Sequence, residues 1–181
     1  MRHMAEHDVD DDLQLLRQRI RDVPDFPQPG ILFRDITPML SDPVAFGVAV
    51  ELIARPYEGV DKVVAIESRG FILGAPVALA LHAGLVPVRK AGRLPADTIF
   101  EDYSLEYGVN VLEIHRDAIS PGERVLIVDD VLATGGTVRA AANLVQRLGG
   151  EVAGVSLLIE LAFLHGRDQL TDLNVRTILV Y

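Results

Sequence analysis

Short runs that are apolar on both faces recur along the chain, and they constrain its fold more than any other feature. Such runs include KVVAI (62–66), LVPV (85–88), RVLIV (124–128) and EVAGVSLLI (151–159), with helix-like segments between most of them. Strands buried on both faces and joined by helices are typical of a parallel sheet that helices cover on each side. The sequence therefore predicts an α/β fold with a mostly parallel central sheet flanked by helices.

Periodicity and capping residues place the other elements. Apolar residues spaced three to four apart predict a helix over 13–23 that ends at Pro24. Asp42 and Pro43 resemble an N-cap and first turn, so a helix should run from there to about Arg55. We also expect helices over 71–83, with Gly84 as the residue that ends it, and over 137–148, and strands at 31–33, 110–114 and 176–180.

No repeat or linker divides the chain, so we expect one domain over 1–181 with two special segments. Residues 1–12 are acidic and should form a disordered tail. Residues 91–108 make a connection long enough to be a functional lid, with Gly92 and Gly108 as hinges. Within it, YSLEY could pair as a ribbon.

Composition excludes several classes of function. The formal net charge of −9 opposes nucleic-acid binding, although RKAGR (89–93) is a basic cluster that could attract a small polyanion or simply be a solvated loop. No apolar run reaches the roughly 18 residues of a membrane span, and no secretory leader is visible, so we expect a cytoplasmic protein. Cysteine is absent, and the five histidines show no metal-ligand spacing.

The stretch VLIVDDVLATGGT (125–137) carries the clearest chemical signal. Asp129 and Asp130 come at the end of an apolar strand, where ligands of α/β sheets bind, and carboxylates there can accept hydrogen bonds from sugar hydroxyls. The ATGGT loop lacks the lysine of a Walker loop but offers main-chain N–H groups at a helix N-terminus, which suit a phosphate. Ribose 5-phosphate fits both features. The alternatives are a tight turn capped by the aspartates or an acidic metal pocket, and neither accounts for TGGT.

At these residues the chain resembles the type I phosphoribosyltransferases, and most closely the members that act on adenine. FPQPGILFRDITPML, ESRGF, RKAGRLP, YSLEYG and VLIVDDVLATGGT occur in the order and approximate spacing of those enzymes, so the resemblance covers residues 13–181. It implies the fold of that family, with a small N-terminal hood and a flexible lid loop.

The resemblance also implies roles for particular residues. The ribose 5-phosphate ligands would be Asp129, Asp130, Ala133, Thr134, Gly135, Gly136 and Thr137. The pyrophosphate ligands would be Ser68, Arg69, Arg89, Lys90 and Arg93, with a cis peptide bond before Arg69. Ala91 and Arg93 depart from a common family pattern, in which a basic residue is frequent at the first position and lysine is usual at the second. Without the resemblance, a surface ion pair between Glu67 and Arg69 is the simpler interpretation.

The adenine ligands implied by the resemblance are Leu32, Phe33, Arg34 and Val131. The main chain at Leu32 and Arg34 would pair with the base edge while Phe33 and Val131 enclose its faces. The alternatives are core packing of Phe33 and an ion pair between Arg34 and Asp35. In the lid, Glu106 would be the general acid and base, with Tyr103, Ser104 and Tyr107 beside it and Arg69 and Arg89 completing the catalytic set.

These implications define an expected activity with two alternatives. A phosphoribosyl group would pass from phosphoribosyl pyrophosphate to adenine, giving AMP and pyrophosphate in purine salvage. Mg²⁺ would be carried by the substrate with no direct protein ligand, and a homodimer is expected. The alternatives are a phosphoribosyltransferase for another base and a regulator that senses phosphoribosyl pyrophosphate without turnover.

Overall fold

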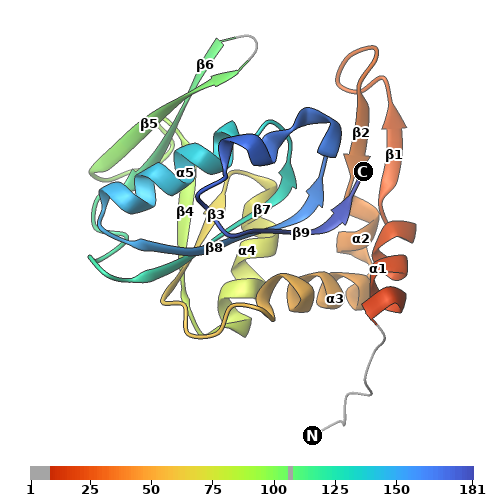
Figure 1. Cartoon of the computed structure of the whole chain (residues 1–181), viewed down its shortest axis with the longest axis horizontal. Coiled ribbons are helices and arrows are strands. Elements are labelled where there is room, and N and C mark those ends of the chain that lie inside the picture. Colours follow the sequence, from red (N-terminus) through yellow and green to blue (C-terminus); the bar gives the residue numbers. More distant parts are fainter. Residues whose placement is uncertain (1–8, 106–107) are drawn as a thin grey trace, which may run out of the picture. The chain divides into compact units, whose positions relative to one another are not determined.

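The computed structural model describes residues 9–105 and 108–181 (Figure 1). The chain divides into two compact units, Met1–Leu52 and Ile53–Tyr181, where the sequence predicted one domain. None of the helices in the described ranges has the length and apolar character that a membrane crossing requires.

The smaller unit consists of helices and one hairpin. Its helices are α1 (Val9–Gln18), α2 (Thr37–Ser41) and α3 (Pro43–Ala54), which continues past the unit boundary. Strands β1 (Arg21–Pro24) and β2 (Leu32–Asp35) pair antiparallel. Helix α3 begins as predicted, because Asp42 Oδ1 accepts hydrogen bonds from the N–H groups of Val44 and Ala45 at 3.0 and 3.2 Å.

Two predictions for the N-terminal region are wrong. Residues 9–12 do not belong to a disordered tail, since α1 starts at Val9 and places Asp10, Asp11 and Asp12 in its first turn, where the helix dipole favours negative charge. The helix also ends at Gln18, well before Pro24. Residues 21–24 form a strand instead, because they pair with β2 in a register that sets Arg21 opposite Asp35.

The larger unit contains a seven-stranded sheet in the order β5-β6-β4-β3-β7-β8-β9. The strands are β3 (Lys62–Ile66), β4 (Gly84–Lys90), β5 (Thr98–Leu105), β6 (Gly108–His115), β7 (Arg124–Leu132), β8 (Glu151–Glu160) and β9 (Val175–Val180). Neighbouring strands from β4 through β3, β7 and β8 to β9 run parallel, whereas β6 pairs antiparallel with both β4 and β5 at one edge. This confirms the predicted mostly parallel α/β sheet.

Helices α4 (Arg69–Ala80) and α5 (Gly136–Arg147) lie on opposite faces of this sheet (Figure 1). The chain passes from β3 through α4 to β4 on one side, and from β7 through α5 to β8 on the other. Because such crossovers are right-handed, opposite directions of travel place the two helices on opposite faces. The sheet is therefore buried on both sides, which explains strands such as β7 with four consecutive buried apolar residues, Val125 to Val128.

The end of α4 differs from the prediction in one detail. The left-handed residue after the helix is His82, with φ 54°, and not Gly84. Gly84 opens β4 instead, and its N–H donates to the carbonyl of Asp61 at 2.9 Å.

Candidate active site

The two central strands, β3 and β7, define the place where a ligand should bind. They are neighbours and parallel, yet the crossover after β3 leads to one side of the sheet and the crossover after β7 leads to the other. Ligands of open α/β sheets bind at the carboxyl ends of strands at such a switch point. The segment Glu67–Arg69 follows β3 and the acids Asp129 and Asp130 lie near the end of β7, so two predicted motifs meet at this point.

The acid pair is buried, which sets its electrostatics. Asp129 is 9% exposed and Asp130 is 4% exposed. Burial, together with the negative charge of Asp130, raises the pKa of Asp129 well above its ordinary value. Burial also raises the pKa of Asp130, although the neighbouring Arg69 guanidinium opposes that rise.

Two protein groups hold the acids in place. Asp129 Oδ1 accepts a hydrogen bond from the N–H of Asp130 at 2.9 Å. Arg69 Nε lies 2.9 Å from Asp130 Oδ2, an ion pair without the alignment of a hydrogen bond. The pair therefore presents negative charge that one arginine partly neutralises.

The loop after the acids forms a small hollow at a helix N-terminus. Its residues Ala133, Thr134, Gly135 and Thr137 line a cavity of about 60 Å³ together with Asp129 and Val131. Gly135 has φ 87° and precedes the first residue of the 12-residue helix α5. A positive φ strongly favours glycine, and the adjoining helix end offers unpaired main-chain N–H groups to an anion. Asp129 and the loop thus line one cavity.

The segment after β3 contains a cis peptide bond between Glu67 and Ser68, before Arg69 as the resemblance implied. Ser68 is the residue that precedes α4, and Arg69 is the first residue of that helix. The alternative ion pair between Glu67 and Arg69 is wrong, because Arg69 pairs with Asp130 and Glu67 pairs with Arg89.

Glu67 organises the basic segment at the end of β4. Its carboxylate accepts hydrogen bonds from Arg89 Nε and Nη2, both at 3.2 Å, and from the N–H of Lys90 at 3.1 Å. Arg89 Nη1 donates to the carbonyl of Arg93 at 2.8 Å. Although burial raises the pKa of Glu67, these contacts with Arg89 and Lys90 bring it below its ordinary value, so this acid is ionised at neutral pH.

Glu113 is a second acid that anchors this segment, and the sequence analysis did not single it out. It is 5% exposed and its Oε1 accepts the N–H groups of Arg93 and Leu94, both at 2.7 Å. The available signal was a charged residue inside the apolar strand NVLEI. A carboxylate on a buried strand requires partners, and here they are main-chain groups of the predicted pyrophosphate segment.

The predicted adenine residues Leu32, Phe33 and Arg34 lie on β2 of the smaller unit. Leu32 is exposed, and the ring of Phe33 packs edge to face against Phe26 with centroids 5.1 Å apart. Arg34 forms an ion pair with Asp22 across the hairpin, so the alternative pairing with Asp35 is wrong. Val131 lies on β7 of the larger unit and lines the cavity of about 60 Å³.

The predicted lid is more regular than expected. Residues 98–105 form strand β5, which pairs antiparallel with β6 as far as the Leu105–Gly108 pair. The ribbon is therefore confirmed for 103–105, the described part of YSLEY, and a loop over all of 91–108 is wrong. The alternation of buried Ile99 and exposed Phe100 stabilises the strand on one face, where Tyr103 packs against the core. Gly92 has φ 78°, as a turn position requires.

Ser104 belongs to the same strand, whereas Glu106 and Tyr107 lie outside the described residues. Their predicted roles therefore remain predictions. Within residues 9–105 and 108–181, no group of three or more His, Asp or Glu side chains could hold a metal ion.

A hollow of about 630 Å³ in the larger unit lies elsewhere and contains none of the predicted site residues. Two of its arginines bind protein groups, since Arg124 donates to the Gly59 carbonyl at 2.6 Å and Arg167 to Glu160 at 2.8 Å. We place the candidate site at Asp129 and Asp130 because a buried acid pair beside main-chain N–H groups is better suited to bind a ligand than a larger hollow whose arginines already bind protein groups.

A buried acid pair beside a main-chain phosphate cradle, at the switch point of a parallel sheet, is the arrangement expected of a phosphoribosyltransferase. Residues 48–178 match the family model of the phosphoribosyl transferase domain. The adenine phosphoribosyltransferase of Thermobifida fusca is 55% identical over 166 residues, which cover 91% of this chain and 94% of that protein. The enzyme of Myxococcus xanthus is 56% identical over 168 residues, covering 92% and 91%.

Solved structures agree with these relatives. The crystal structure of adenine phosphoribosyltransferase from Rhodothermus marinus has a TM-score of 0.91 and 53% identity, covering 95% of this chain and 99% of that one. The Saccharomyces cerevisiae enzyme, complexed with an imino-altritol bisphosphate and adenine, has a TM-score of 0.88 and 40% identity, covering 94% and 99%. The chain therefore belongs to the adenine phosphoribosyltransferase family.

Proposed function

We propose that this protein transfers the 5-phosphoribosyl group of phosphoribosyl pyrophosphate to adenine, forming AMP and releasing pyrophosphate in purine salvage. The observation that carries the proposal is the shared cavity of Asp129 and the Ala133–Thr137 loop, which a family relationship at 55% identity supports. In the reaction, the bond between ribose C1 and a pyrophosphate oxygen breaks and an imidazole nitrogen of the base bonds to C1. The proton of that nitrogen leaves.

We assign the ribosyl part of the substrate to β7 and the loop after it. The carboxylates of Asp129 and Asp130 would accept hydrogen bonds from the ribose hydroxyls. The main-chain N–H groups of residues 133–137, with the hydroxyls of Thr134 and Thr137, would bind the 5-phosphate. Burial favours these contacts, because hydrogen bonds to charged groups are stronger where water is excluded.

The leaving pyrophosphate is assigned to Ser68, Arg69, Arg89, Lys90 and Arg93. Arginines bind diphosphate oxygens in pairs and stabilise the charge that develops as the C1 bond breaks. Glu67 and Glu113 hold Arg89 and the turn at Arg93 in position through the hydrogen bonds at 2.7–3.2 Å. Arg69 also neutralises part of the charge of Asp130, which favours that carboxylate at neutral pH.

Adenine recognition is assigned to the hairpin of the smaller unit. The main chain at Leu32 and Arg34 would read the base edge, and Phe33 would lie against a face of the base. A fixed donor and acceptor leave buried groups unpaired when a 6-oxo base takes the place of adenine, which gives strong discrimination without a charged side chain. Phe26 and Asp22 support this hairpin by their contacts with Phe33 and Arg34.

Glu106 is proposed as the group that accepts the proton from the base imidazole, and as the acid in the reverse direction. The ribbon of β5 and β6, with Tyr103, Ser104 and Tyr107, would exclude water from the oxocarbenium-like state. Mg²⁺ would arrive with the diphosphate, since this ion binds substrate phosphates and water more readily than an all-protein cage.

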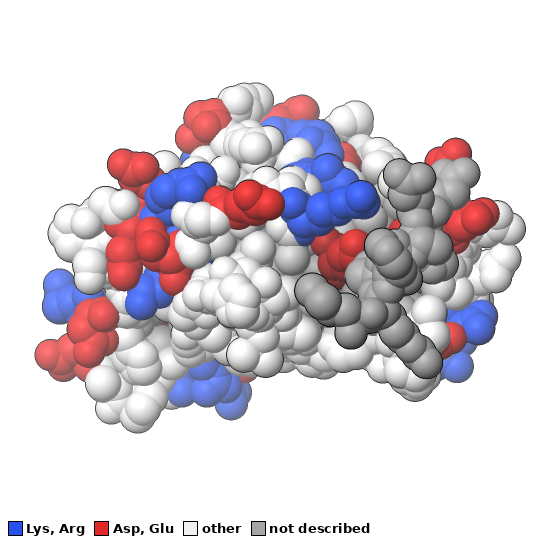
Figure 2. Space-filling view, turned by 90° about the horizontal axis from the view of Figure 1, so that it is seen from below, with Lys and Arg blue, Asp and Glu red and all other residues white. Residues whose placement is uncertain are grey.

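We further propose that the protein works as a cytoplasmic homodimer on small molecules. On the face shown in Figure 2, acidic and basic side chains of the described residues are intermixed, and the net charge of the chain is −9. Both features disfavour binding to nucleic acid.

A steady-state assay with phosphoribosyl pyrophosphate, Mg²⁺ and a panel of free bases tests the function. We expect one AMP and one pyrophosphate per adenine consumed, and far slower reaction with hypoxanthine, xanthine or orotate. Preference for another base would replace the adenine assignment. Binding of ribose 5-phosphate without turnover of any base would indicate a regulator. The Asp129→Asn, Asp130→Asn double variant is the control and should bind ribose 5-phosphate weakly.

A further inference from the structure

The loop assigned to the 5-phosphate packs against a second segment that no motif indicated. This segment follows β8 and contains two short 3-10 helices, η1 (Ala162–Leu164) and η2 (Gly166–Gln169). At its centre, Gly166 lies so close to the loop that a Cβ atom on it would be 2.2 Å from the carbonyl oxygen of Ala133 and 3.1 Å from the nitrogen of Gly135. The main chains of the two segments are therefore in direct contact.

The contact is reciprocal. A Cβ atom on Gly135 would be 2.3 Å from the carbonyl oxygen of Gly166. Any side chain at either position would force main-chain atoms apart by roughly 1 Å, since an ordinary contact begins at 3.4 Å. Flexible side chains could rotate away, but carbonyl oxygens of packed segments can move only if the segments move.

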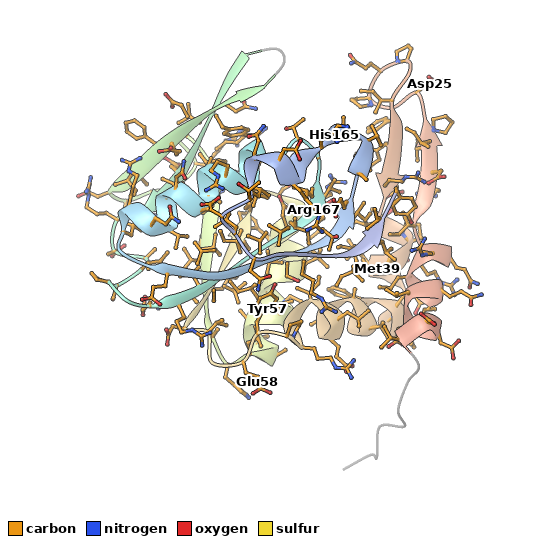
Figure 3. All side chains as sticks on the ribbon, in the orientation of Figure 1. Asp25, Met39, Tyr57, Glu58, His165 and Arg167 are labelled. Carbon is orange, nitrogen blue, oxygen red and sulfur yellow. The ribbon has the colours of Figure 1, made fainter. Side chains whose placement is uncertain are left out.

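The segment around Gly166 is anchored to the rest of the larger unit on both sides. The N–H of Leu161 donates to the carbonyl of Leu132 at 2.9 Å. Arg139 of α5 donates to the carbonyl of Gln169 from Nε at 3.0 Å and from Nη2 at 2.8 Å. Arg167 pairs with Glu160 at 2.8 Å, and Figure 3 labels both Arg167 and His165 of this segment. These contacts hold the main chain on both sides of Gly166 in place.

From these contacts we infer that Gly166 is a positioning residue for the 5-phosphate loop, an inference that rests on the proposed function of that loop. The carbonyl of Ala133 faces Gly166. In a planar trans peptide the C=O and the next N–H point in opposite directions, so the N–H of Thr134 points away from Gly166. Bracing the Ala133 carbonyl therefore fixes the direction of a donor assigned to the phosphate.

Gly166→Ala tests the inference, with Gly47→Ala as the matched control because a Cβ at Gly47 meets nothing within 4 Å. We expect the affinity of Gly166→Ala for ribose 5-phosphate, measured by calorimetry, to fall at least about tenfold, which corresponds to about 1.4 kcal/mol. Affinity for pyrophosphate should stay within about twofold, since its assigned ligands lie elsewhere. Gly47→Ala should match the wild type for both ligands.

Measuring both ribose 5-phosphate and pyrophosphate separates a positioning role from a loss of folding, because unfolding would weaken the binding of both ligands. If Gly166→Ala binds ribose 5-phosphate as tightly as the wild type, the inference is wrong although the proposed function stands. If the wild type itself fails to bind ribose 5-phosphate, the proposed function fails first.

A measurement on the wild type covers the case in which Gly166→Ala does not fold. Ribose 5-phosphate should slow hydrogen exchange of the amides at residues 165–168 as well as those of the loop, because the two segments share one contact surface. Pyrophosphate should leave both unchanged. Slower exchange confined to the loop would overturn the inference.

Discussion

Replacing Asp129 with asparagine should make the protein more stable at neutral pH and should weaken its binding of ribose 5-phosphate. Asp129 is 9% exposed, and its raised pKa means that burial and the charge of Asp130 outweigh every contact that favours its ionised form. An asparagine carries no charge to bury, and its Oδ1 can still accept the hydrogen bond from the N–H of Asp130.

The size of the gain follows from linkage. Each unit by which folding raises the pKa of an acid removes about 1.4 kcal/mol of stability once the acid is ionised in both states. Because burial and the charge of Asp130 disfavour the ionised form and Asn retains the hydrogen bond, we expect Asp129→Asn to increase the free energy of unfolding at neutral pH by about 1–2 kcal/mol, the usual size of a stabilising substitution. Affinity for ribose 5-phosphate should fall about tenfold, since a charged acceptor is lost.

The pH dependence gives the sharper test. The folded-state pKa of Asp129 lies above its ordinary value of 3.8, so the folded protein binds more protons than the unfolded chain, and wild-type stability falls as pH rises through that window. Below 3.8 the acid is protonated in both states, and the advantage of the variant should vanish there. Urea unfolding from about pH 4 to about pH 8 measures the difference.

Asp172→Asn in the same unit is the control with the opposite trend. Hydrogen bonding from Arg139 lowers the pKa of Asp172, so its contribution is present above the ordinary value of 3.8 and is lost as pH falls. That variant should be less stable than the wild type at neutral pH and should converge with it in acid. An Asp129→Asn protein that is less stable at neutral pH, or whose gain is independent of pH, would refute the reasoning.

Three further predictions concern the same site. Glu67→Gln should weaken pyrophosphate binding about tenfold by releasing Arg89, with calorimetry as the measurement and unchanged binding as the contradiction. Gly70→Ala should weaken ribose 5-phosphate binding, because its Cβ would be 2.8 Å from Asp129 Oδ1 and would displace that carboxylate. A normal dissociation constant would show that binding does not depend on the position of the Asp129 carboxylate. Glu106→Gln should reduce kcat by roughly 10²- to 10⁴-fold with little change in affinity for phosphoribosyl pyrophosphate, and near-normal turnover would remove this residue from the mechanism.

Elements that depend on neighbouring residues could be predicted from the sequence. Strand β3 has the predicted bounds, Lys62–Ile66, because an apolar run between polar residues is a local signal. The start of α3 followed in the same way from Asp42 and Pro43. Strand β1 could not be predicted, since Val23 continues the helical spacing of the residues before it. Its strand conformation depends on pairing with β2, about ten residues further along the chain.

The site divides along the same line. The acids and the phosphate loop lie within one stretch, 125–137, which resembles that of type I phosphoribosyltransferases, so their proximity could be predicted from the sequence. The ion-pair partners of the charged residues could not be predicted. Both ion pairs weighed from sequence, Glu67 with Arg69 and Arg34 with Asp35, joined residues one or two apart. Nearness in sequence suggested them, whereas the sheet sets Glu67 beside Arg89 and the hairpin sets Arg34 beside Asp22.

Local stability and site chemistry conflict at β7, and the surroundings of the strand resolve the conflict. Apolar residues at positions 129 and 130 would be buried without loss, yet β7 buries two adjacent carboxyls there, and the pKa values of both rise. Besides the ion pair of Arg69 with Asp130, close glycine contacts leave little room for adjustment, from Gly70 at Asp129 to Gly166 at the loop. A buried acid pair persists only where its surroundings are rigid, because relaxation would otherwise admit water or separate the charges. Close main-chain packing around β7 is therefore the condition under which this strand can carry two aspartates near its end and still present them to a ligand.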